Sequence, residues 1–147
     1  MKYLSLIVSV ALTIFIFSMS AESGVESASM SQTVAFFVQD LIDEIIYPAV
    51  FEIEMLELVI RKAAHVCEYF ILGISYALTF HLFHLPLWSL IIAGVIIALG
   101  DEASQLLAES RGPSFFDAMV YDVPGYLLGI LLLKRLAWKP KRKINVS

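Results

Sequence analysis

Four long apolar stretches constrain the fold of this chain more than any other feature of its sequence. They cover residues 3–19, 63–82, 85–100 and 120–136. At a rise of about 1.5 Å per residue, helices of these lengths nearly cross a hydrocarbon core about 30 Å thick. Hydrophobic residues make up 59% of the 147-residue chain, and a soluble domain of that size has too little interior to bury them. The sequence therefore predicts an all-α polytopic membrane protein, a bundle of four transmembrane helices in one domain with the lipid bilayer as its partner.

The first stretch also fits a second interpretation. Lys2, the apolar run and the small residues around Ser20 have the layout of a secretory signal with a cleavage site before Ala21. The run is longer than a usual signal core, which favours a retained span. In both interpretations the segment that follows the first stretch lies outside the cytoplasm.

The distribution of Lys and Arg predicts the orientation. The basic tail, residues 134–147, carries six Lys and Arg residues, whereas residues 20–60 carry eight acidic residues and no Lys or Arg. Loops and tails rich in Lys and Arg stay in the cytoplasm. We therefore expect a multi-pass protein of the plasma membrane with both termini cytoplasmic and with residues 20–60 on the outer side.

Residues 31–60 are expected to be more than a linker. Between residues 34 and 46 apolar side chains recur at three- and four-residue spacing, with acidic side chains on the opposite face. This pattern predicts an extracytoplasmic amphipathic helix that ends near Pro48, because proline disrupts a helix interior. An acidic face does not adhere to anionic lipid, so we expect the helix to lie on the bundle as a lid or brace. Residues 18–31, rich in Ser and Gly, are expected to form a flexible lead-in.

Ionisable side chains gather where the second, third and fourth stretches reach the outer side. At about 100° per residue, five polar residues between positions 61 and 69 fall on one arc of the second helix. The third stretch leads into Asp101 and Glu102, and a Gly-Pro turn with a predicted cap at Ser114 precedes the fourth. We expect the topology to bring these side chains to one face, in a shared site that we name the polar cluster. The polar cluster consists of Arg61, Lys62, His65, Glu68, Tyr69, Asp101, Glu102, Gln105, Arg111, Ser114 and Asp117.

Two features are predicted to serve packing. Gly125 and Gly129 lie four residues apart in the fourth stretch, a spacing that allows two helices to approach closely. Cys67 is the single cysteine, so the chain forms no internal disulfide. It lies on the opposite side of its helix from the polar residues and is expected to pack against apolar neighbours.

Taken in order, the polar blocks resemble the VanZ-like family of bacterial integral membrane proteins. The resemblance covers residues 61–130 and is carried by four motifs. These are Arg61-Lys62-x-x-His65-x-x-Glu68-Tyr69, Asp101-Glu102-x-x-Gln105, Arg111-x-x-Ser114-x-x-Asp117 and Gly125-x-x-x-Gly129. The family is named for a protein linked to teicoplanin resistance. The resemblance implies a bacterial cell-envelope protein with four spans, in which the polar blocks form a common site on the outer face.

The sequence departs from the family pattern at the start of the fourth stretch. Members usually place Asp or Asn four residues after the position of Asp117, and Gly three residues further on. Here Tyr121 stands at that place, Asp122 comes one residue later, and Pro124 precedes Gly125. The departure indicates a shift or a kink at the start of the fourth helix, and Asp122 is only loosely associated with the polar cluster.

The polar cluster admits several functions. As a structural network, its charges pair and hold short helices together, and Arg111 with Asp117 closes a loop. As a binding site, it takes a lipid, a wall precursor or a lipoglycopeptide and contributes to teicoplanin resistance, with Arg and Lys on phosphate or carboxylate groups. As a membrane-embedded enzyme acting on a lipid-linked envelope precursor, it uses acid–base or metal chemistry. The candidate catalytic residues are His65, Glu68, Asp101 and Glu102.

A small transporter or proton relay is a further interpretation, and it requires a homo-oligomer because four short spans enclose little space. The sequence predicts no cofactor and no nucleic-acid partner. His65, Glu68, Asp101 and Glu102 could together hold a divalent cation, but one His among carboxylates is an unspecific ligand pattern, and the sequence therefore predicts no metal centre. Of these functions, a binding site is the one that we favour for the polar cluster as a whole.

Overall fold

The computed structural model describes residues 1–45, 52–108 and 112–137, and these ranges are helical with short connections and no strand. Four helices are long and apolar enough to cross a membrane: Lys2–Ser20, Ile53–Leu82, Leu87–Ser104 and Phe115–Leu136. Each of them overlaps one of the four predicted stretches. The prediction of an all-α bundle with four spans is therefore confirmed.

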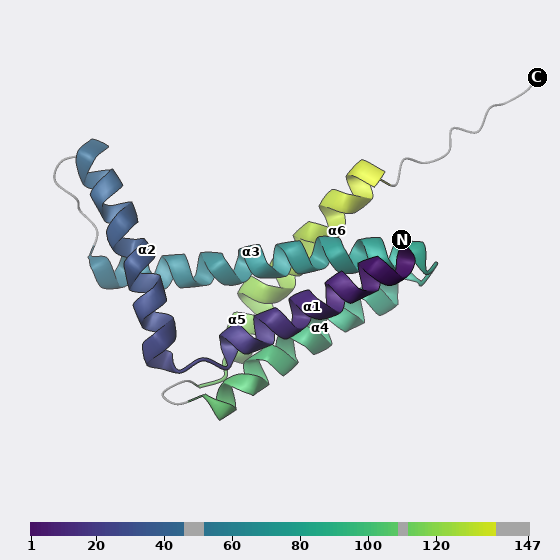
Figure 1. Cartoon of the computed structure of the whole chain (residues 1–147), viewed down its shortest axis with the longest axis horizontal. Coiled ribbons are helices and arrows are strands. Elements are labelled where there is room, and N and C mark those ends of the chain that lie inside the picture. The colour runs from purple at the N-terminus through teal and green to yellow at the C-terminus, as the bar shows by residue number, and fades with distance from the viewer. Residues whose placement is uncertain (46–51, 109–111, 138–147) are drawn as a thin grey trace, which may run out of the picture.

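In chain order the elements are α1 (Lys2–Ser20), α2 (Gly24–Ile45), α3 (Ile53–Leu82), α4 (Leu87–Ser104), the 3-10 helix η1 (Gln105–Leu107), α5 (Phe115–Asp117), the π-helix η2 (Ala118–Asp122) and α6 (Val123–Ala137). The last three follow one another without a break and together make the fourth span. Helix α3 is central, because it contacts α1, α2, α4 and α6. Figure 1 shows α1 and α4 alongside α3, and α2 lying across its first half.

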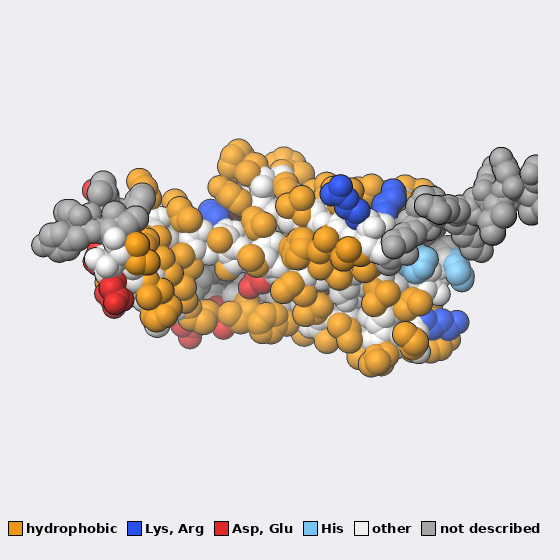
Figure 2. Space-filling view, turned by 90° about the horizontal axis from the view of Figure 1, so that it is seen from above, with side chains coloured by type: hydrophobic (Ala, Val, Ile, Leu, Met, Phe, Trp, Pro, Cys, Tyr) orange, Lys and Arg blue, Asp and Glu red, His pale blue; other side chains and the backbone are white. Residues whose placement is uncertain are grey.

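The spans alternate in direction, which gives the bundle two distinct ends (Figure 1). The N-terminus and the turn between α3 and α4 lie at one end, which we name the opposite end. The last turns of α1 and α4 and the beginning of α3 lie at the other, which we name the α2 end because α2 lies there. In Figure 2 hydrophobic side chains cover the middle of the visible face, acidic side chains lie toward the α2 end, and His side chains lie toward the opposite end. This distribution suits a bundle whose middle is surrounded by lipid.

Helix α2 begins at Gly24, so the prediction of a flexible lead-in over residues 18–31 is wrong. Ser23 starts the helix: its hydroxyl oxygen accepts the amide of Glu26 at 3.2 Å, and the Glu26 carboxylate accepts the amide of Ser23 at 3.2 Å. Such a capping box begins a helix even within a Ser-rich segment. The buried side chains of α2 are all small, namely Ser27, Ser31 and Ala35. They allow α2 to cross α3 closely, in keeping with the expected brace.

Helix α3 starts at Ile53 rather than at residue 63, the predicted start of the second span. A prediction from hydropathy alone places the start of the span after the charged residues. These charged residues nevertheless lie at a spacing that allows them to pair along a helix. Arg61 donates to the Glu57 carboxylate, four residues earlier, at 2.5 Å. The expected end of the preceding helix near Pro48 lies outside the described residues.

Glycines hold α3 and α6 in close contact, as the four-residue spacing predicts. A Cβ atom added at Gly125 would lie 2.6 Å from the carbonyl oxygen of Val66, and one at Gly129 would overlap the carbonyl oxygen of Phe70. A third glycine, Gly73 on α3, faces the backbone of Tyr126 in the same way. The two helices therefore touch through their backbones over more than one turn.

Hydroxyl groups join α1 to α3 in the half of the bundle toward the opposite end. Ser9 Oγ lies 2.8 Å from Ser75 Oγ and 2.9 Å from Thr79 Oγ1, and Thr13 Oγ1 lies 3.1 Å from the Tyr76 hydroxyl. Hydrogen bonds between helices stabilise contacts in lipid, where water offers no alternative partner. We name these five residues the hydroxyl seam.

Candidate functional site

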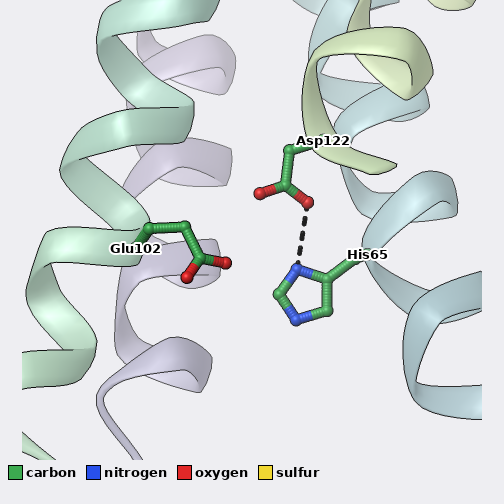
Figure 3. Close-up of side chains that lie close together, drawn as sticks. All are labelled: His65, Glu102 and Asp122. Atoms are coloured by element: carbon green, nitrogen blue, oxygen red, sulfur yellow. Dashed lines mark hydrogen bonds and ion pairs between the residues drawn. The ribbon is translucent and has the colours of Figure 1, made fainter. Parts of the chain in front are cut away.

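A histidine and a buried aspartate form the centre of the site. His65 comes from α3 and Asp122 from η2, and His65 Nδ1 lies 3.1 Å from Asp122 Oδ1 (Figure 3). Glu102, from the end of α4, points toward the same space. Asp122 is 0% exposed and Glu102 is 3% exposed, so both carboxylates are removed from solvent. One ligand atom from each of the three residues lies within 4.8 Å of the other two.

The π-helix η2 explains the departure from the family pattern. Relative to that pattern, Asp122 and Gly125 each come one residue later after Asp117. A π turn accommodates one residue more than an α turn and is frequent at functional sites. Helix η2 takes up the extra residue, so Asp122 faces His65 while Gly125 faces α3. The kink expected from the sequence is therefore a π turn, and Asp122, which the sequence associates only loosely with the polar cluster, lies at the centre of that cluster.

Glu102 is oriented by the connection to the fourth span. One of its oxygens, Oε2, accepts the amide of Ser114 at 2.7 Å. The Ser114 hydroxyl oxygen accepts the amide of Asp117 at 3.1 Å, so the predicted cap at Ser114 is confirmed. These two bonds link the end of α4 to the start of α5 and hold the Glu102 carboxylate beside the centre.

Asp101 and Tyr69 lie deeper in the bundle and are wholly buried. The Ser20 hydroxyl donates to Asp101 Oδ2 at 3.0 Å, which connects the last turn of α1 to α4. Asp101 and Asp122 both interact electrostatically with Tyr69 and His65. Asp101 and Tyr69 therefore support the centre from the interior of the bundle. Cys67, in contrast, is exposed and lies apart from the centre.

Two cations at the α2 end are engaged by acids. Lys62 forms an ion pair with Asp117, and its ammonium group also lies 5.1 Å from the centre of the Tyr121 ring. Arg61 pairs with Glu57, as described above. Arg111, the expected partner of Asp117 in the structural interpretation, lies outside the described residues.

Three hollow spaces are lined by His65, by Lys62 or by both. The first, of about 190 Å³, lies between the end of α1, α2 and α3, and it reaches Arg61, His65 and Glu68. The second, of about 200 Å³, we name the polar pocket, and six of its eight lining residues belong to the polar cluster: Arg61, Lys62, His65, Glu102, Gln105 and Asp117. The third, of about 380 Å³, we name the apolar groove, and it is lined by Leu58, Val59, Lys62, Ala63, Val66 and Tyr121.

A family model described as VanZ/LLP1 matches residues 5–138. The chain belongs to the VanZ/LLP1 family. The match extends beyond residues 61–130 and includes α1 and α2, so the whole bundle is part of the family's domain. Comparison with curated proteins and with solved structures found no match.

In this VanZ/LLP1 chain the centre is suited to proton transfer or to cation binding. The bond between His65 and Asp122 orients the imidazole ring and leaves one ring nitrogen for another partner. The hydroxyl groups of Ser104 and Ser114 are engaged elsewhere, because Ser104 Oγ donates to the carbonyl oxygen of Asp101 at 2.6 Å and Ser114 Oγ serves as a cap. The arrangement therefore offers a base and two carboxylates, without a serine hydroxyl bonded to His65 among the described residues.

Proposed function

We propose that the chain binds an amphiphile at one surface of the bacterial plasma membrane, with the polar headgroup in the polar pocket and the hydrocarbon chain in the apolar groove. One observation carries this proposal. Lys62 and Tyr121 line both spaces, so the polar pocket adjoins the apolar groove. A ligand with a charged head and an apolar tail is complementary to such a pair of spaces.

The charges of the polar pocket restrict the headgroup. Arg61 and Lys62 suit phosphate or carboxylate groups, whereas Glu102 and Asp117 suit amines and hydroxyls. Lipid-linked wall precursors and acylated glycopeptides carry both kinds of group beside a hydrocarbon chain. In this proposal the protein is a cell-envelope factor that contributes to teicoplanin resistance by holding one of these amphiphiles at the membrane.

The proposal requires the α2 end to face the outside of the cell and both termini to lie in the cytoplasm. This orientation is supported by the acidic residues of positions 20–60 and by the basic tail. A phosphatase fused after residue 147 should be inactive, because this enzyme folds only outside the cytoplasm. An active fusion would contradict the orientation and, with it, the outward-facing site.

Teicoplanin susceptibility in a bacterial host tests the headgroup. Lys62→Gln removes the cation shared by both spaces, and we expect it to lower resistance to the level of cells without the protein. Lys134→Gln, a matched change on an exposed residue near the end of α6, should keep full resistance. Immunoblots of membranes would establish equal amounts of each variant. Full resistance with Lys62→Gln would contradict a headgroup site in the polar pocket.

The hydrocarbon chain is tested separately with purified protein in detergent. Teicoplanin should raise the unfolding temperature of the wild-type chain, because a ligand that binds only the folded state stabilises it. Ala63→Trp fills the apolar groove and should abolish this shift, whereas Ala103→Trp, an exposed position outside the groove, should retain it. The deacylated glycopeptide should give little or no shift in the unfolding temperature of any of the three proteins. Equal shifts with and without the acyl chain would exclude the groove as its site.

The bond between His65 and Asp122 favours a second candidate function, a membrane-embedded enzyme that acts on a lipid-linked envelope precursor. His65 would serve as general base or acid, with Asp122 orienting the imidazole ring. Purified protein incubated with such a precursor should then give a product that His65→Ala eliminates. Binding of the precursor without any product would leave the first function alone in place.

A further inference from the structure

The centre brings more negative charge together than its own cations balance. His65 interacts electrostatically with four carboxylates, those of Glu68, Asp101, Glu102 and Asp122. Lys62 attracts Asp122 but forms its ion pair with Asp117, and Arg61 forms its ion pair with Glu57. A protonated imidazole offsets one negative charge, and buried carboxylates without a counter-charge are strongly destabilising. Additional positive charge at the centre would therefore stabilise the ionised carboxylates.

One carboxylate oxygen is directed into this space without a partner. Asp122 is 0% exposed, and its Oδ2 atom has no hydrogen-bond partner among the described residues. Its other oxygen bonds His65, and Figure 3 shows the free oxygen directed toward the side of Glu102. A buried acceptor of this kind loses the full hydration of a charged group. His65 and Lys62 attract this carboxylate, but no described side chain forms a hydrogen bond with Oδ2.

We propose that His65, Glu102 and Asp122 bind one divalent transition-metal ion. The site goes beyond amphiphile binding and stands on these three side chains alone, so either proposal can fail without the other. Imidazole with carboxylates suits Mn²⁺, Fe²⁺ or Zn²⁺, whereas Mg²⁺ and Ca²⁺ prefer oxygen ligands throughout. The metal ion would supply positive charge at the centre, and the unpartnered Asp122 oxygen would be one of its ligands.

The distances fit a single ion. Metal–ligand bonds of about 2.0–2.2 Å place two ligands at most about 4.4 Å apart. The three ligand atoms lie within 4.8 Å of one another, so a shift of a few tenths of an ångström closes them around the ion. The ligands come from α3, the end of α4 and η2, so the ion joins three of the four spans.

The surrounding bonds resemble those that orient metal ligands in proteins. Glu102 accepts the Ser114 amide at 2.7 Å through one oxygen, which leaves the other for the ion. The π turn determines the direction of Asp122, as shown above. The prediction of no metal centre from the sequence did not include Asp122, the residue that turns one His among carboxylates into a compact set of three.

Mn²⁺ titration of the purified, chelator-treated full chain tests the site, because electron paramagnetic resonance reports the free ion. We expect about one Mn²⁺ bound per wild-type chain, and affinity lowered at least about tenfold in Glu102→Gln and Asp122→Asn. Glu54→Gln and Asp40→Asn are matched changes at exposed positions and should bind as the wild type does. A wild-type chain without a saturable site, or equal affinity in all variants, would overturn the proposal.

A second readout does not depend on how the acidic variants fold. In pulsed electron paramagnetic resonance, the nitrogen of a coordinated imidazole modulates the echo signal of bound Mn²⁺. The chain has three His residues that could give this modulation. The modulation should be present in the wild type, absent in His65→Gln and retained in His84→Gln. Bound Mn²⁺ without nitrogen modulation in the wild type would show that the ion lies elsewhere and would reject the site.

Discussion

The hydroxyl seam and the polar cluster are both polar, both lie inside the bundle and both involve α3, yet they are built from different chemistry. In the seam, neutral hydroxyl groups of α1 and α3 bond one another, and Ser9 alone meets both Ser75 and Thr79. In the polar cluster, buried carboxylates outnumber the cations that face them, and an oxygen of Asp122 is without a described partner. Neutral pairs strengthen helix contacts in lipid, whereas buried charges are costly there.

This difference indicates that the hydroxyl seam serves helix packing, whereas packing alone does not account for the polar cluster. A side chain that serves packing alone gains nothing from being ionised within a membrane. The seam therefore uses neutral hydroxyl groups, whose burial costs less free energy than that of charged groups. Retaining several carboxylates in the polar cluster lowers stability unless something else binds them. We therefore expect substitutions in the seam to reduce stability without altering ligands, and substitutions in the cluster to do the reverse.

The largest expected effect removes the scaffold that both regions share. Gly129→Leu forces α6 away from α3, because even a Cβ atom at this position overlaps the α3 backbone. We expect the free energy of unfolding to fall by about 3 kcal/mol or more, and Mn²⁺ binding to be lost with it. Unfolding by SDS in mixed micelles measures the change. Gly112→Leu is the control, because a Cβ there meets nothing within 4 Å, and an equal loss for both variants would show that glycine packing is not the cause.

The next effect tests the seam alone. Ser9→Ala leaves the Ser75 and Thr79 hydroxyls without their common partner and should reduce the free energy of unfolding by about 1–2 kcal/mol. Mn²⁺ binding should be unchanged, since the polar cluster is untouched. Ser18→Ala, at a position where the hydroxyl bonds only its own helix, should have little effect on stability. Loss of Mn²⁺ binding in Ser9→Ala would end the distinction between the two regions.

A smaller effect concerns an ion pair at the border of the polar cluster. Glu57→Gln breaks the pair with Arg61, which is partly exposed, and should reduce the free energy of unfolding by about 0.3–0.5 kcal/mol. Glu54→Gln, on an exposed position of the same helix, is the matched control. A loss of several kcal/mol in the first variant would place Glu57 within the structural core.

The smallest expected effect is at the π turn. Deleting Val120 restores the family spacing between Asp117 and Asp122, and we expect a regular α-helix that still directs Asp122 toward His65. Mn²⁺ affinity and melting temperature should stay close to those of the wild type. Deleting Leu127 instead rotates Gly129 away from α3 by about 100° and should unfold the bundle. If the Val120 deletion loses Mn²⁺ binding, the π turn is required for the site and does more than absorb an extra residue.

Much of this architecture could be predicted from the sequence, and the reasons are local. Apolar stretches of membrane-crossing length identify the spans, and the glycine spacing identifies a close helix contact. Errors arose where local signals compete. Ser and Gly between residues 18 and 31 suggested a loop, but the capping box of Ser23 and Glu26 starts a helix there. Charges at the start of α3 suggested the end of a span, although they pair along a helix.

The sequence predicted which described side chains reach the α2 end of the bundle, but not that His65 and Asp122 bond each other there. By itself the sequence determined that His65 and Glu102 come to the same end of the bundle, because alternating spans allow no other arrangement. Only the tertiary structure decided that Asp122 joins them, since that depends on one π turn within the fourth span. One additional residue changes the direction of the following helical side chains by about 100°. The hydrophobicity of a span does not indicate where along its length a π turn accommodates that residue.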